Sequence, residues 1–212
     1  MVSSHYIDIS WPLDEQSSSY KNNKPLSFTQ LKDFAHDAVR DSTITLNSHT
    51  GTHIDAPAHF LANGSTVETI PLTSLVGTCV VLDLTSVSDG ITKEDLLPHA
   101  ALLTSQTIVL LKTRNSELPY NAPFTSMFIY LTQSGAEFLA QCQVATVGID
   151  YLGIERGQPD HATHTVLMEN GITIVEGLRL AALSQIRYHF ICLPLAVQGL
   201  EAAPARAVVT PL

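Results

Sequence analysis

The segment from Ser48 to Phe60 concentrates side chains that bind divalent metals. It carries three of the nine histidines and one aspartate, all at odd-numbered positions: His49, His53, Asp55 and His59. In a helix Asp55 would point well away from His49, whereas in an extended chain every second side chain faces the same way. We therefore expect an extended segment that aims all four side chains at one face until Pro57 ends the ladder.

Two neutral imidazoles and one carboxylate on a shared face form a site for a first-row divalent metal. Zn²⁺ or Mn²⁺ suits this mixture of nitrogen and oxygen ligands, with one or two ions per subunit. Gly51 leaves room for an ion or a substrate to approach the backbone. His59 follows Pro57, where the chain can turn, so it is free to act as an acid or base. The alternative is a histidine-rich surface loop, and the alignment of four such side chains disfavours it.

A metal held by two histidines and one aspartate has open positions, and four residues downstream could fill them: His161, His164, Glu169 and Glu176. The two histidines lie three apart at the start of a helix expected over residues 160–170, so they could share a face. Glu176 ends an apolar strand, where a carboxylate must be solvated, paired or bound to a cation. From the residues alone a solvated strand end explains Glu176 equally well, and His161 and Glu169 fit solvated helix positions better.

The remaining sequence predicts a mixed α/β domain with a β-rich core and few short helices. Apolar runs predict strands at residues 75–84, 107–113, 144–149, 172–176, 189–195 and 205–210. The long helices that alternate with strands in a doubly wound sheet are missing. An alternating strand at residues 42–47 leads directly into the histidine segment. We expect a single domain over residues 1–212, in which residues 1–40 could form an N-terminal arm.

Composition excludes several classes of partner. The net charge is −9 and no cluster of lysine or arginine occurs, which disfavours binding to nucleic acid or an anionic membrane. The longest apolar run, Phe190 to Val197, is too short to span a membrane. The absence of a secretory leader and the three scattered cysteines predict a reducing, cytoplasmic location. Only 15% of residues are charged, so we expect a homodimer or higher homo-oligomer that covers part of the surface.

The residues His49-Thr-Gly-Thr-His53-Ile-Asp55-Ala-Pro-Ala-His59 resemble the H-x-G-T-H-x-D-x-P-x-H signature of the cyclase family. That family includes the bacterial kynurenine formamidases and the isatin hydrolases. Three further segments are similar to family motifs, so the resemblance covers nearly the whole chain: Asp8-Ile-Ser-Trp-Pro-Leu13, His164 with Glu176-Gly-Leu178, and Pro204-Ala-Arg-Ala-Val208.

The resemblance implies a swivelling β/β/α-type fold and a metal-dependent hydrolase that cleaves a carbon–nitrogen amide bond, like the kynurenine formamidases (arylformamidases) of tryptophan catabolism. It implies that His49, His53 and Asp55 bind one metal. Asp55 and Glu176 would reach a second metal, which His164 would complete. A metal-bound hydroxide would attack the amide carbonyl, with His59 as the acid/base.

One departure concerns the substrate. The family's formamidases carry a substrate-contacting tryptophan in a W-P-G-D segment, and the nearest equivalent here is Tyr20-Lys-Asn-Asn23. We expect Tyr20 to contact an aromatic amide or a cyclic amide, in its own or a neighbouring subunit's site; an exposed loop tyrosine is the alternative. Two other functions stay open: a cyclic amide or lactone hydrolase resembling the isatin hydrolases, and a non-catalytic metal-binding protein. Retention of His59 disfavours the second.

Overall fold

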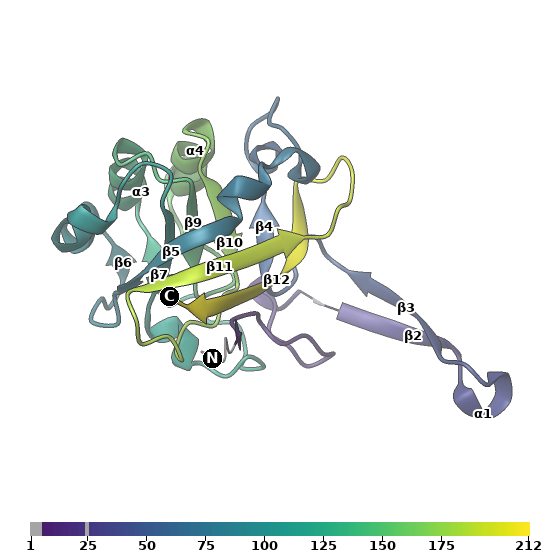
Figure 1. Cartoon of the computed structure of the whole chain (residues 1–212). Helices are drawn as coiled ribbons and strands as arrows, with labels where there is room; N and C mark the ends of the chain where they lie inside the picture. The colour runs from purple at the N-terminus through teal and green to yellow at the C-terminus, as the bar shows by residue number, and fades with distance from the viewer. Residues whose placement is uncertain (1–5, 24–25) are drawn as a thin grey trace.

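The computed structural model describes residues 6–23 and 26–212; residues 1–5, where the expected N-terminal arm begins, and residues 24–25 lie outside the described part (Figure 1). Its core is an eight-stranded sheet in the order β1 (Ile7–Asp8), β12 (Ala202–Pro211), β11 (Arg187–Pro194), β5 (Val76–Asp83), β7 (Ile108–Lys112), β9 (Thr146–Ile149), β10 (Thr173–Glu176) and β4 (His53–Asp55). Because β12 also pairs with β4, the sheet closes into a barrel.

Successive side chains along the strands alternate between two apolar layers. One set of side chains fills the inside of the closed sheet, including Ile54, Leu110 and Phe190, all fully buried. The opposite set, including Val109 and Val147, packs against short helices on the outside. These helices are α2 (Lys93–Leu96), α3 (Gln133–Gln141) and α4 (Ala162–Glu169). The expectation of a mixed α/β domain with a β-rich core and few short helices is confirmed.

The helix boundaries follow local capping chemistry. Thr92 and Asp95 form the reciprocal capping box that starts α2. The helix expected over residues 160–170 begins later, at Ala162. Asp160 and His161 adopt left-handed φ angles of 53° and 51°, so the chain makes a separate turn before α4.

Strands β2 (Leu26–Lys32) and β3 (Asp41–Leu46), joined by α1 (Phe34–Asp37), form a hairpin that projects from the barrel (Figure 1). The strand expected at residues 42–47 is present, but it pairs with β2 in this separate sheet and does not continue into the site strand. A second small sheet pairs β6 (Gly90–Ile91) with β8 (Tyr130–Leu131). Among the described residues, none of the helices has the length and apolar character needed to cross a membrane.

Candidate metal centre

The histidine segment is a turn followed by a short strand. His53 and Asp55 lie on β4, whereas residues 47–52 turn, with a backbone hydrogen bond from the Thr50 amide to the Asn47 carbonyl. The prediction that the chain is extended from His49 onward is therefore wrong before His53. The reason is Gly51, whose φ of +62° lies in the left-handed region.

The sequence suggested that Gly51 leaves room for an ion or a substrate, but in the structure neighbouring protein atoms occupy that space. A side chain added there would meet Leu13 at 2.6 Å, and one added at Gly177, whose φ is +70°, would collide with the Gly51 carbonyl. The Thr52 hydroxyl, in the same turn, donates to the Gly177 carbonyl at 2.6 Å. This close approach joins the histidine turn to the end of β10, which carries Glu176.

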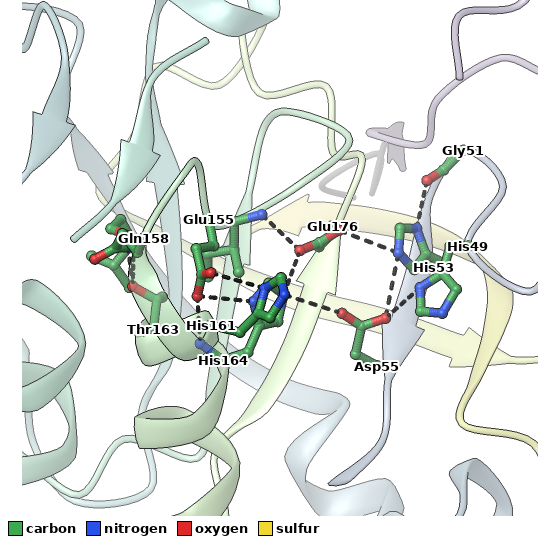
Figure 2. Close-up of polar contacts among 12 residues, drawn as sticks. His49, Gly51, His53, Asp55, Glu155, Gln158, His161, Thr163, His164 and Glu176 are labelled. Atoms are coloured by element: carbon green, nitrogen blue, oxygen red, sulfur yellow. Dashed lines mark hydrogen bonds and ion pairs between the residues drawn. The ribbon is translucent and has the colours of Figure 1, made fainter. Parts of the chain in front are cut away.

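Sheet register then brings three buried side chains together. His53 pairs directly with Glu176 across β4 and β10, and Asp55 lies two residues along the same face. The Nε2 atom of His53 is 3.3 Å from Glu176 Oε2 and 3.4 Å from Asp55 Oδ1 (Figure 2). His49, from the preceding turn, places its Nδ1 3.0 Å from Asp55 Oδ1.

Helix α4 supplies the remaining histidine. His164 Nε2 lies 3.3 Å from Glu176 Oε1 and 3.8 Å from Asp55 Oδ2. All five residues expected to bind metal therefore converge, from a turn, two strands and a helix: His49, His53, Asp55, His164 and Glu176 (Figure 2). His161 and Glu169, the weaker candidates, do not join them, and Glu169 is exposed.

Three buried atoms at this point have no hydrogen-bond partner: His53 Nε2 and both carboxylate oxygens of Asp55. The other ring nitrogen of His53 lies 2.9 Å from the Gly51 carbonyl oxygen. Since a carbonyl only accepts, Nδ1 carries a proton, and in the neutral ring Nε2 is the nitrogen whose lone pair is available to a cation. Buried unpaired nitrogen and oxygen atoms are costly, and a divalent cation with a mixed ligand set would satisfy them.

The pKa shifts indicate that the carboxylates of the cluster stabilise positive charge on the neighbouring histidines. Burial alone would lower the pKa of His53, but the negative charges of Asp55 and Glu176 outweigh it and raise the pKa to about 9. Burial would also lower the pKa of His164, but hydrogen bonds to Glu155 and Glu176 outweigh this effect and raise the pKa to about 10. Burial would raise the pKa of Glu176, yet its contacts with His164 and His53 and the positive charges of these two histidines hold it well below its usual range.

His59 lies beside this cluster, in the 3-10 turn Pro57–His59. Its ring centroid is 4.2 Å from that of His49 and 6.0 Å from that of His164. Burial lowers the pKa of His59; Asp55 opposes this shift, and His49 and His164 add to it. The imidazole is therefore neutral near pH 7. One of its nitrogens lies within 4.8 Å of ligand atoms of His49 and Asp55, so proximity alone also permits metal binding by His59.

A cavity of about 540 Å³ opens over the cluster. His49, His59, His164 and Glu176 line it, together with the largely apolar side chains of Tyr20, Phe60 and Leu152. Tyr20 thus faces the pocket of its own chain, with its ring 5.0 Å from that of Phe124. Burial and the negative charges of Glu176 and Glu155 raise the pKa of Tyr20.

Comparison with known proteins fits this geometry. A family model described as "Putative cyclase" matches residues 7–156. The chain belongs to the cyclase family. The resemblance in the sequence motifs is thereby confirmed.

Relatives in the cyclase family extend over the whole chain. A kynurenine formamidase of Bacillus cytotoxicus is 29% identical over 214 residues, covering 100% of both chains. A solved structure described as a "predicted metal-dependent hydrolase" from Bacillus stearothermophilus is 40% identical, with a TM-score of 0.88 and coverage of 100% of both chains. Isatin hydrolase A from Labrenzia aggregata shares the fold, with 21% identity, a TM-score of 0.83 and coverage of 98% of this chain and 93% of that one.

Two pocket residues of this cyclase-family chain were missed by the sequence analysis. Phe60 stacks near three imidazoles, with centroid distances of 4.1 Å to His59, 4.5 Å to His164 and 4.6 Å to His161. Glu155 has a side chain only 4% exposed, and it contacts His161 and His164. Its position in a glycine-containing loop gave no sign of burial. Phe60 directly follows His59, which was the available signal.

Proposed function

We propose that this chain is a metal-dependent hydrolase that cleaves carbon–nitrogen amide bonds, as the kynurenine formamidases do. The observation that carries the proposal is the convergence of five ligand-type side chains, four of them buried and His49 partly buried, in which three buried atoms lack hydrogen bonds. Three of these residues, His49, His164 and Glu176, also line the cavity. The match to a metal-dependent hydrolase at 40% identity supports it. We infer that turnover takes place in the cytoplasm, because all three cysteines are free thiols.

In this proposal His49, His53 and Asp55 hold one divalent cation, and Asp55, His164 and Glu176 hold a second where two are present. The mixed donors fit Zn²⁺ or Mn²⁺. When bound, such a cation supplies Lewis-acid chemistry that polarises a carbonyl and eases deprotonation of water. His59 is the acid/base: its imidazole takes the proton of the attacking water and delivers it to the leaving nitrogen, so that the C–N bond breaks.

Uptake of the cation should release protons. At pH 7 the metal-free site holds protons on His53 and His164, whose pKa values are about 9 and about 10. Raising the pH towards these pKa values removes the protons and frees the ring nitrogens, so metal affinity should rise from pH 7 and level off only above about pH 10. Calorimetric titration with Mn²⁺ in buffers of different ionisation enthalpy measures the released protons. Affinity that is independent of pH would contradict this ligand assignment.

The substrate we propose is an aryl formamide of the N-formylkynurenine type. The relatives named kynurenine formamidase motivate this choice, and the aromatic walls formed by Tyr20 and Phe60 fit an aryl ring. The decisive assay compares initial rates on N-formylkynurenine, isatin and an aryl lactone with the same protein sample. Fastest turnover of N-formylkynurenine is expected; preference for isatin would favour a cyclic amide hydrolase, and no turnover at all would favour a metal-binding protein.

Replacing Tyr20 by alanine should weaken substrate binding. Loss of the ring that borders the cavity should raise KM for the aryl formamide about tenfold, or about 1.4 kcal/mol, with little change in kcat. Tyr20→Phe is the matched control, because it keeps the ring and removes only the hydroxyl. Steady-state kinetics of the two variants test the assignment, and an unchanged KM in Tyr20→Ala would remove Tyr20 from the substrate site.

We propose that the chain forms a homodimer through the β2–β3 hairpin. Cross-strand pairs place Leu26 opposite Leu46 and Phe28 opposite Ile44 on one face of the hairpin. Phe28 is 53% and Ile44 is 62% exposed in the single chain. An isolated two-stranded hairpin is marginally stable in water, so this apolar face requires a partner. A second copy presents the same apolar face, which suits a two-fold contact.

Phe28→Asp should therefore convert the dimer to a monomer, since the new carboxylate would be buried without a partner. Thr29→Asp is the matched control, because Thr29 pairs with Thr43 on the polar face of the same hairpin. Sedimentation equilibrium should give half the parent mass for Phe28→Asp and the parent mass for Thr29→Asp. A parent protein that is monomeric at micromolar concentration would refute the proposal.

A further inference from the structure

Glu155 is a buried carboxylate behind the proposed ligand His164, in the loop between β9 and α4. Its Oε2 accepts a hydrogen bond from the His164 backbone amide at 3.1 Å and lies 3.2 Å from His164 Nδ1. Its Oε1 lies 3.1 Å from His161 Nδ1 (Figure 2). One carboxylate thus ties the first turn of α4 to the imidazole that points into the metal cluster.

These contacts determine which nitrogen of His164 faces the cluster. An ionised carboxylate only accepts hydrogen bonds, so Nδ1 of His164 carries a proton and Nε2 is left to face Glu176 and Asp55. Carboxylates that orient a metal-binding histidine from behind also make its free nitrogen a better ligand. We propose that Glu155 is the positioning residue that holds His164 in its metal-binding orientation, an inference that rests on the proposed function.

The same residues could form a separate cation site, since ligand atoms of Glu155, His161 and His164 lie within 4.8 Å of one another. The contacts favour positioning. Both Glu155 oxygens already face hydrogen-bond donors, whereas the buried atoms of this site that lack a hydrogen bond belong to His53 and Asp55. His161 is also 63% exposed in its side chain, so it adds little to a buried site.

The test is calorimetric titration of the metal-stripped protein with Mn²⁺. Glu155→Leu removes the acceptor at similar volume and should weaken binding at the site served by His164 by about 10–100-fold, the usual effect of losing such an orienting partner. Glu155→Gln keeps a carbonyl that can accept from the helix amide but removes the charge, and should weaken binding less. His161→Ala is the matched control, because it removes the exposed partner and should leave affinity unchanged.

Thermal unfolding of the metal-free variants separates positioning from a merely structural role. A lowered Tm with parent affinity for Mn²⁺ would overturn the proposal, as would an equal loss of affinity in His161→Ala. If Glu155→Leu does not fold, weaker Mn²⁺ binding by Glu155→Gln than by His161→Ala still supports the proposal, and equal binding overturns it. If the parent protein itself took up no Mn²⁺, the proposed function would fail and this inference with it.

Discussion

His53→Ala should lose bound metal and hydrolytic activity together. His53 is 1% exposed and faces Asp55 and Glu176 with a ring nitrogen that has no hydrogen bond. Its removal leaves two buried carboxylates without the nitrogen between them. Metal affinity should fall more than about 100-fold, since even the loss of an outer partner of a ligand costs about 10–100-fold. Metal analysis of the purified variant and its rate of formamide hydrolysis measure the two effects.

His36→Ala serves as the control for this variant. His36 lies at the tip of the projecting hairpin with its side chain 82% exposed, so metal content and activity should match the parent. His53→Ala protein that folds, retains a full complement of metal and hydrolyses formamides at the parent rate would contradict the ligand assignment.

His59→Ala should separate metal binding from catalysis. Removing a positioned acid/base reduces kcat by about 10²–10⁴-fold. The proposed ligands remain in place, so metal content should stay at the parent level. Single-turnover rates on N-formylkynurenine, with metal analysis of the same sample, test both halves of this expectation.

The two assignments permitted by the geometry give different results for this variant. If His59 were a ligand with His49 and Asp55, His59→Ala would lose metal as well as rate. Activity at the parent rate would remove His59 from the chemistry altogether. His36→Ala, at an exposed histidine outside the pocket, is the control and should retain the activity of the parent.

Apolar runs in the sequence predicted the strands in which consecutive residues are buried. The runs that form β5, β7 and β9 are apolar enough to require a sheet covered on both faces, and they are found there. Closure of the barrel could not be predicted, because it depends on residues 202–204 pairing with β4 about 150 positions earlier in the chain. Nor does alternation in residues 42–47 reveal that this strand leaves the barrel and joins a hairpin.

The site shows the same division between local and distant causes. A period of two places His53 and Asp55 on one face because both lie on β4. His49 reaches the cluster by a left-handed turn at Gly51, which the alternating pattern could not reveal. Glu155 was missed because its burial arises from packing against α4, and its loop contains glycines and charges that are typical of solvent-exposed segments.

The most direct test of the account is removal and return of the metal. Purified protein is stripped with a chelator, assayed on N-formylkynurenine, and assayed again after addition of Mn²⁺ or Zn²⁺. Turnover should disappear with the metal and return with it, while His53→Ala should not recover under the same conditions. Stripped protein that works at the full rate without bound metal would contradict the central claim that these side chains hold a catalytic cation.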